Sequence, residues 1–280
     1  METTEARLIH SETTLAAPMP SHWKTILAIT LNAFRESVRD RVLYNLILFV
    51  LILVGASVFI SELSIDQENK FIADLGLSSM VIFGAIIAIF IGVGLVYKEI
   101  DRRTIYNLLS KPVHRYQFII GKYFGLCLTL LVNTGVMTAG TIVALIFANK
   151  GFGRLQLAVL PSAYLIYLEL ALIVAVALMF SSFSTPMLST LFSFAVYVIG
   201  HFSSDLRLAA EMSDSGLVKG VLYGLYYVMP NLSTFSFIGE ASRGQMVPLA
   251  VAGKATLYAI LYVVILLSAS AAILQRRNFK

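Results

Sequence analysis

Residues 155–204 read LQLAVLPSAYLIYLELALIVAVALMFSSFSTPMLSTLFSFAVYVIGHFSS, a run of fifty residues with a single charge, Glu169. A helix that crosses about 30 Å of hydrocarbon needs about 20 consecutive, mostly apolar residues, so this run is long enough for two spans. The segment SSFSTP at 181–186 divides it, because Pro186 lacks an amide donor and disfavours helical angles in the residue before it. We therefore predict membrane helices over 156–180 and 186–204.

Four further charge-poor stretches predict four more spans, over 42–61, 75–97, 122–149 and 254–275. The composition agrees, since 58% of the residues are apolar and 13% charged, against about 45–50% and about 25% in soluble domains. This excludes an ordinary soluble enzyme or a nucleic-acid-binding protein. The single cysteine, Cys127, excludes an intrachain disulfide and a cysteine-based metal site. The predicted fold class is an all-α integral membrane protein with six transmembrane helices forming one domain, residues 42–280.

The positive charges are distributed unevenly along the chain. If the N-terminus is cytoplasmic and there are six spans, fourteen of the 21 lysines and arginines fall on the cytoplasmic side. Cytoplasmic loops of membrane proteins carry this excess, so we predict that both termini are cytoplasmic. Residues 1–20 are polar, lack the apolar core of a signal peptide, and are expected to be a disordered cytoplasmic tail.

Residues 220–239 form a seventh uncharged stretch, but its middle is unsuited to a simple span. Met229, Pro230 and Asn231 interrupt it, and Ser233, Thr234 and Ser236 follow. Broken backbone survives at membrane depth only against protein or water. We predict a broken re-entrant or interfacial segment here, before the last span.

Residues 21–41 have the pattern of an amphipathic helix just before the first predicted span. Apolar side chains recur every three or four residues on one side, while basic and polar ones fall elsewhere. Such a helix is expected to lie in the cytoplasmic interface. A plain membrane anchor with no further role is the alternative. The residues that define it are Trp23, Phe34, Arg35, Arg39 and Arg41.

The loop between the second and third predicted spans combines charges with an apolar strip. Ile105, Leu108 and Leu109 supply the strip, and Pro112 ends it. Charge together with exposed aliphatic side chains is typical of a docking surface. A basic loop that merely follows the charge rule of membrane proteins is the alternative.

Two motifs, FRESVRDRVLY at 34–44 and E-x₄-T-I-Y-x-L-L-S-K-P-V-x-R-x-x-F-x-x-G-K at 99–122, resemble those of permease subunits of ABC-2 type transporters. The resemblance extends along the chain, including the six spans and the broken segment before the last one. It implies an N-terminal elbow helix at 21–41 and a cytoplasmic coupling helix at about 99–111 that binds an ATPase. The coupling residues that it indicates are Glu99, Arg102, Arg103, Thr104, Ile105, Leu108, Leu109, Lys111, Pro112 and Arg115.

The same resemblance implies partners and a location. A second permease copy, identical or different, and two copies of a separate ATPase are expected, in a bacterial inner membrane. ATP and Mg²⁺ would be bound by the ATPase. The sequence of this chain is consistent with a separate ATPase. Neither of its Gly-Lys pairs, at 121–122 and 253–254, lies in a phosphate-binding G-x-x-x-x-G-K-[ST] motif. The predicted function is export by alternating access, without catalysis in this chain.

Glu169 is the only charge inside a predicted span. A carboxylate at the centre of a membrane helix costs about 2.5–3.5 kcal/mol on insertion scales, so it requires a partner or a proton. Its own helix offers only aliphatic neighbours one turn away, so the partner must come from another helix or another subunit. The candidates are Asn133, Thr134, Thr138 and Thr141 of the third span. It is either a cargo-path or gating residue or a protonated packing residue.

In the fifth predicted span, Ser189, Ser193, Tyr197 and His201 share one face, which is either a packing seam or a polar pore lining. His201 is expected near the outer end, with no metal site there. The residues proposed for a translocation path are Glu169, Asn133, Thr138, Ser193 and Tyr197.

Three other functions compete with the permease. A secondary transporter usually buries several ionisable groups and shows an internal repeat, whereas this chain has one buried carboxylate and no evident repeat. A membrane-embedded enzyme needs clustered ligands or a base beside a nucleophile, and the four histidines are scattered. A non-transporting membrane anchor for an ATPase remains open.

Overall fold

The structure is a computed structural model that describes residues 22–39, 48–49, 52, 55, 68–101, 115–149 and 151–276. The elements within these ranges are helical. They are α2 (His22–Arg39), α4 (Glu68–Asp101), α6 (Arg115–Asn149), α7 (Arg154–Ser181), α8 (Pro186–His201), α9 (Ser203–Met212), α10 (Gly216–Val228), the 3₁₀ helix η1 (Leu232–Phe235), α11 (Ile238–Ala241) and α12 (Leu249–Arg276). The predicted first span, 42–61, falls almost wholly outside the described residues.

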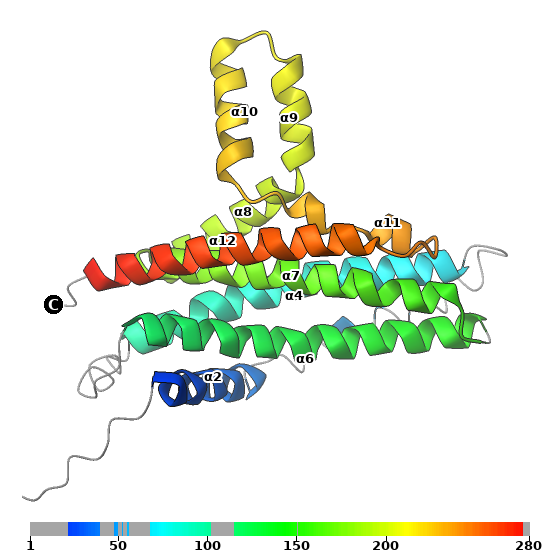
Figure 1. Ribbon diagram of the computed structural model, residues 1–280, viewed down its shortest axis with the longest axis horizontal. Coiled ribbons are helices and arrows are strands. Elements are labelled where there is room, and N and C mark those ends of the chain that lie inside the picture. The colour runs from blue at the N-terminus through cyan, green and yellow to red at the C-terminus, as the bar shows by residue number, and fades with distance from the viewer. Residues whose placement is uncertain are drawn as a thin grey trace, which may run out of the picture.

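Four long helices, α4, α6, α7 and α12, run side by side as a bundle (Figure 1). Each contains an apolar window long enough to cross a membrane, and the bent pair α8–α9 brings the candidates among the described residues to five. The chain is therefore a multi-pass membrane protein by length and composition. Six spans stay a prediction.

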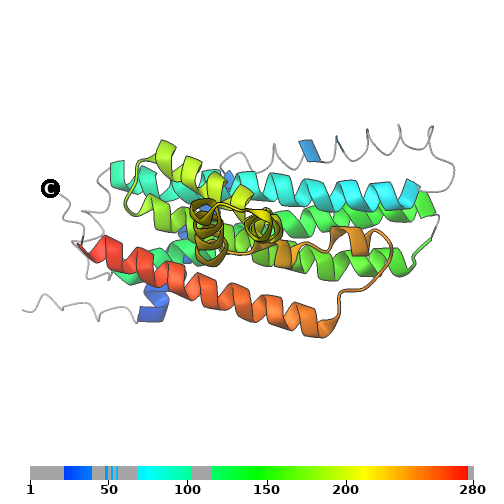
Figure 2. The same ribbon diagram turned by 90° about the horizontal axis from the view of Figure 1, so that it is seen from above.

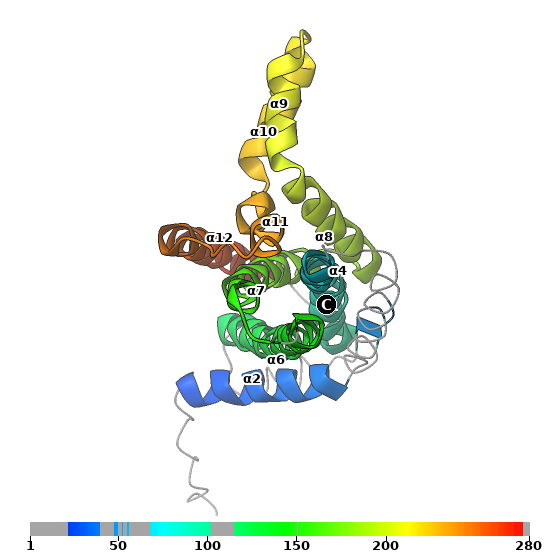
Figure 3. The same cartoon turned by 90° about the vertical axis from the view of Figure 1, so that its right-hand side faces the viewer.

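Helix α7 lies at the centre of this bundle. It packs against α4, α6, α8 and α12, and α4 and α12 lie on opposite sides of it (Figures 2 and 3). In its most apolar window 78% of the residues are buried, against 17% for α12. The sequence of α7 fits this position because it is apolar on all sides, as expected of a helix enclosed by others.

The turn between α7 and α8 lies at the predicted segment. Helix α7 ends at Ser181, and α8 begins at Pro186, whose missing amide donor costs nothing at the first helical position. Helix α8 then runs for only 16 residues, about 24 Å at 1.5 Å per residue, which is less than the hydrocarbon thickness. Instead of one straight span over 186–204, the chain bends by 66° between α8 and α9.

Helices α9 and α10 form a hairpin that projects from the bundle (Figure 1). Helix α10 has no buried residue and ends at Val228, where the predicted break at 229–231 begins. The chain then returns to the bundle through η1, which packs against α7 and α8. The region predicted to be re-entrant or interfacial is thus the second arm of a helical hairpin followed by a 3₁₀ turn.

Helix α2 lies across the bundle against α6 (Figure 3). Helix α2 contacts the N-terminal part of α6. This is the end of the bundle at which α4 ends and at which the C-terminus of the chain lies (Figure 1). We call this the α2 end. The predicted amphipathic helix over 21–41 is thus present as His22–Arg39, while its role as an elbow helix stays a prediction.

Candidate functional site between α7 and α8

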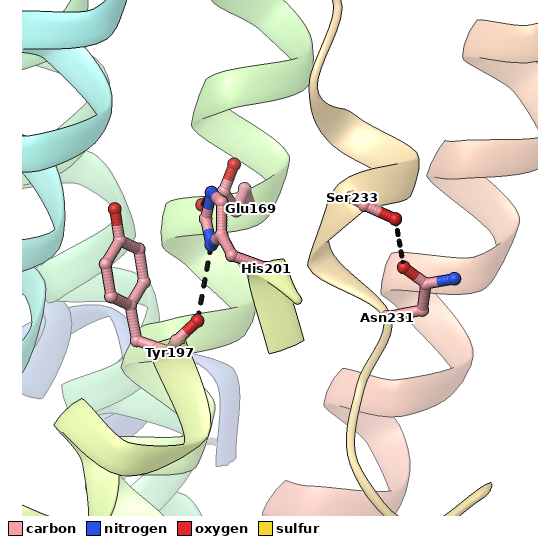
Figure 4. A network of polar contacts seen from close by, with 5 residues as sticks. All are labelled: Glu169, Tyr197, His201, Asn231 and Ser233. Carbon is pink, nitrogen blue, oxygen red and sulfur yellow. Dashed lines mark hydrogen bonds and ion pairs between the residues drawn. The ribbon is translucent and has the colours of Figure 1, made fainter. Parts of the chain in front are cut away.

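Glu169 is buried in the centre of α7, with its side chain 1% exposed. Its Oε1 atom lies 3.5 Å from Nε2 of His201, the last residue of α8 (Figure 4). Neither carboxyl oxygen has a hydrogen-bond partner among the residues that the structure describes. An unpaired carboxylate there would cost several kcal/mol. His201 is therefore the side chain placed to compensate Glu169.

The orientation of the His201 ring follows from its second nitrogen. Nδ1 lies 3.3 Å from the backbone carbonyl oxygen of Tyr197, one turn earlier in α8 (Figure 4). Because a carbonyl only accepts hydrogen bonds, this contact favours the tautomer with the proton on Nδ1. In the neutral imidazole Nε2 is then an acceptor that faces the Glu169 carboxyl group. The Tyr197 ring packs against the imidazole, with the two ring centroids 4.7 Å apart.

The end of α8 is fixed by close packing as well. A Cβ atom added to Gly200 would lie 2.7 Å from the backbone oxygen of Pro230, so only glycine permits this approach. The segment after α10 is in turn held by Tyr258 of α12, whose hydroxyl oxygen accepts a hydrogen bond from the backbone N–H of Asn231 at 2.7 Å. Ser233 donates to the Asn231 side chain at 2.6 Å (Figure 4).

The partner predicted for Glu169 was wrong. The threonines of α6 satisfy their hydroxyl groups on their own helix, where Thr134, Thr138 and Thr141 donate to the carbonyl oxygens four residues earlier. The Asn133 amide nitrogen lies 3.7 Å from the Met137 sulfur. The partner comes instead from α8, which packs against α7 so that its last residue, His201, lies beside the middle of α7 rather than near the outer end.

The five residues proposed for a translocation path do not share one cavity. Thr138 lines a groove of about 360 Å³ between α6 and α7, together with Leu131, Gly135, Tyr164 and Tyr167. Glu169 instead contacts His201 of α8, and Tyr197 packs against the His201 ring. Ser193 is buried in α8 with its hydroxyl donated to the Ser189 carbonyl oxygen at 2.7 Å. The serines of α8 thus face neighbouring helices, as a packing seam requires, and Asn133 is buried in α6.

A second polar contact lies at the α2 end, where α2 crosses α6. Lys122 of α6 is 1% exposed, and its Nζ atom lies 3.6 Å from the Glu36 carboxylate of α2. Gln117 Nε2 is 2.6 Å from His22 Nδ1 at the start of α2. The sequence analysis did not pair Glu36 with Lys122, although both residues lie within the quoted motifs.

Two glycines of α6, Gly121 and Gly125, let α2 approach closely. An added Cβ would lie 2.7 Å from Cβ of Ile29 at the first position and 2.6 Å from Cβ of Ala33 at the second. Glycines four residues apart allow helix backbones to meet in this way in membranes. The G-x-x-x-G pattern at 121–125 was readable in the sequence but was not used.

Of the residues predicted for the elbow helix, Trp23 and Arg35 are exposed and Phe34 is half-buried. Arg39 is the last residue of α2, and Arg41 lies outside the described residues. Of the predicted coupling residues, Glu99 lies in the last turn of α4 and Arg115 is the first residue of α6. The others lie outside the described residues; they are Arg102, Arg103, Thr104, Ile105, Leu108, Leu109, Lys111 and Pro112.

Comparison with known families decides the class of this membrane protein. A family model described as "ABC-2 family transporter protein" matches residues 27–278, nearly the whole chain. The chain belongs to the ABC-2 family. A search of the curated proteins found no match to it. As an ABC-2 family member, the chain is a membrane permease component of an ABC transporter, in a family whose permeases generally dimerise and work with an ABC ATPase.

Proposed function

We propose that this chain is the membrane-spanning subunit of an ATP-driven exporter. Two permease copies would work with two copies of a separate ATPase, which binds ATP and Mg²⁺. The assembly would lie in a bacterial inner membrane with both termini of this chain in the cytoplasm. The absence of a phosphate-binding G-x-x-x-x-G-K-[ST] motif from the sequence supports a division of labour between the two kinds of subunit.

The observation that carries this proposal is the arrangement of helices at the α2 end. Helix α4 ends at Asp101 and α6 begins at Arg115, so the sequence proposed for ATPase docking links the ends of two long helices. Helix α2 is joined to the first turns of the second one through Gln117, Gly121 and Lys122. A partner that binds residues 99–111 would therefore act on three helices at once.

Movement applied at this end would be carried through packed helices rather than through flexible chain. Both α4 and α6 pack along α7, which contacts α8 and α12 in turn. Closure of two ATPases could in this way tilt the bundles between inward-facing and outward-facing arrangements. Such a transition requires an element with two discrete packings, and the bent α8–α9 connection is the candidate within this chain.

Copurification tests the partnership. The full chain is extracted in mild detergent with its ATPase, and Leu108 and Leu109 are both changed to Asp. Loss of the apolar strip should abolish ATPase copurification. Two exposed leucines of the hairpin, Leu208 and Leu217, receive the same change as a matched control and should keep the ATPase. An ATPase that stays bound to the Leu108→Asp, Leu109→Asp variant, or none under mild extraction, would contradict the proposal.

Transport tests the function itself. Inside-out membrane vesicles that contain both subunits should accumulate cargo when ATP is supplied and should stop when the docking strip is altered. Accumulation that depends on an ion gradient and not on ATP would favour a secondary transporter. ATPase binding without any ATP-dependent transport would favour the membrane anchor.

A further inference from the structure

The Glu169–His201 contact lies where the chain changes direction. His201 is the last residue of α8, and α9 begins at Ser203 after the 66° bend. The hairpin α9–α10 continues from this point and projects from the bundle (Figure 1). A change in how the end of α8 is held against α7 would therefore change the direction of the whole hairpin.

The pair can be described by counting its protons. With one proton, it is either a neutral carboxyl group facing a neutral imidazole or a carboxylate facing an imidazolium, and its net charge is zero in both forms. Without that proton, a buried carboxylate faces the Nε2 lone pair of a neutral imidazole. In the tautomer that the Tyr197 carbonyl favours, the other ring proton is on Nδ1, and the ring offers a donor to Glu169 only after it gains a proton.

On α9 and α11, which pack against α8 and α7, the charged residues are Asp205, Arg207, Glu211 and Glu240, and none of them forms an ion pair with Glu169 or His201 in the described part of the chain. On α8 the neighbouring titratable group is the Tyr197 phenol. Helices α6 and α12 carry no charge over 123–148 and 255–275. On α4, the residue that faces Leu170, next to Glu169, is Gly84. The charged residue of α4 nearest to Gly84 in sequence is Asp74, ten residues earlier and about 15 Å away along the helix. The segment at η1 contributes the uncharged Asn231 and Ser233.

We propose that Glu169 and His201 form a one-proton binding site, and that occupancy of this site holds the α8–α9 bend against α7. In the occupied state, the buried Glu169 carboxyl group holds the proton and directs it toward His201 Nε2, because burial disfavours the carboxylate–imidazolium form. At 3.5 Å the carboxyl oxygen and Nε2 are farther apart than in a formed hydrogen bond, so a small approach of α8 completes the contact. The site is independent of whether an ATPase binds this chain.

The two side chains differ in access to their surroundings. The Glu169 side chain is 1% exposed, whereas that of His201 is 28% exposed. The imidazole is therefore the exposed member of the pair, and the carboxyl group is the enclosed one. When the proton leaves as the pH rises, the carboxylate and the Nε2 lone pair repel each other. The end of α8 then separates from α7, and the hairpin changes its orientation.

Infrared spectroscopy of the full chain in lipid nanodiscs tests the proton. A protonated carboxyl group has a C=O stretching band of its own, and the pH is varied between about 5 and 10 to cover carboxyl and imidazole titration. We expect a carboxylic-acid band that is present at neutral pH, is lost on alkalinisation and is missing from Glu169→Gln. The matched control Glu240→Gln, in the half-buried turn of α11, should keep the band. A spectrum of Glu169→Gln identical to that of the wild type at every pH would overturn the proposal.

A spin label on the hairpin tests the mechanical consequence. Leu217, 85% exposed at the start of α10, is changed to Cys in a Cys127→Ala background and labelled. The mobility of the label should change over the pH range in which the infrared band disappears. Glu169→Gln, which can still donate to Nε2 but cannot ionise, should abolish that change.

A His201→Gln variant keeps the test informative if Glu169→Gln does not fold. It should also lose the response of the label, because the Gln amide can accept from a protonated Glu169 and donate to an ionised one, so the end of α8 is held in both states. A pH response of the label that is unaltered in either variant, or a carboxyl band that titrates with no response of the label, would overturn the mechanism. Neither measurement requires the ATPase, so failure of the proposed export function would not be mistaken for failure of this site.

Discussion

Gly125→Ala is expected to displace α2 from α6. The added Cβ would lie 2.6 Å from the Ala33 Cβ and 2.7 Å from the Thr30 carbonyl oxygen. Neither atom is the end of a flexible side chain, so the clash cannot be relieved by a change of rotamer. Carbon atoms pack at about 3.5–4.0 Å, and α2 must therefore move away by about 1 Å or dissociate from α6.

The magnitude follows from overpacking. Forcing an extra carbon into a packed contact costs about 1–3 kcal/mol, which lowers the docked population of α2 by about 5- to 150-fold relative to the undocked one. Replacing a helical glycine by alanine also favours the helix by about 0.5–1 kcal/mol. Gly135→Ala is the matched control, because it makes the same change in the same helix with nothing within 4 Å of the new Cβ.

The single tryptophan, Trp23, provides the assay. It follows His22, whose Nδ1 atom lies 3.3 Å from the hydroxyl of Tyr116 at the start of α6. A nitroxide attached at Tyr116→Cys, in a Cys127→Ala background, should quench Trp23 fluorescence while α2 is docked. We expect the quenching to fall in Gly125→Ala and to persist in Gly135→Ala. Equal quenching in the two variants would refute the close-packing argument.

Two further substitutions probe the other contacts. Glu36→Lys places a second ammonium beside buried Lys122 and should undock α2 in the same quenching assay. Arg35→Glu, at an exposed position, is the control and should leave α2 docked. Similar quenching in the two variants would show that the ion pair has no role. Gly200→Ala drives a Cβ into a backbone carbonyl and should lower the stability by about 1–3 kcal/mol, seen as an earlier thermal unfolding transition in detergent. Gly216→Ala, with open space around its Cβ, is the control, and equal transitions would contradict the packing at the end of α8.

The helices of the bundle were largely predictable because hydropathy is a local property. Long charge-free runs indicated α4, α6, α7 and α12, and the three- to four-residue period of apolar side chains indicated α2. The turn before Pro186 followed from the chemistry of proline. The helices extend beyond the predicted spans, as in α6, which begins at Arg115 rather than at 122, since a helix continues past the apolar window that predicts it.

The candidate site was only partly predictable. Glu169 stood out because a buried charge is costly, and the face that carries Ser193, Tyr197 and His201 was visible as a four-residue period. Its pairing with His201 depends on how α8 packs against α7, and hydropathy does not reveal which residues of two packed helices face each other. The threonines of α6 were wrong as partners because a threonine in a helix can donate to its own backbone, and composition does not reveal that choice.

The central position of α7 has a consequence for biosynthesis. Helices α4 and α6 leave the ribosome first, yet each packs along a helix that is not complete until residue 181 has been made. Helix α12 comes last and adds to the outside of a core that already exists, with most of its surface left outward. We therefore expect the nascent chain to gain a protease-resistant fold once α7 has inserted, while truncation before α12 leaves that core intact.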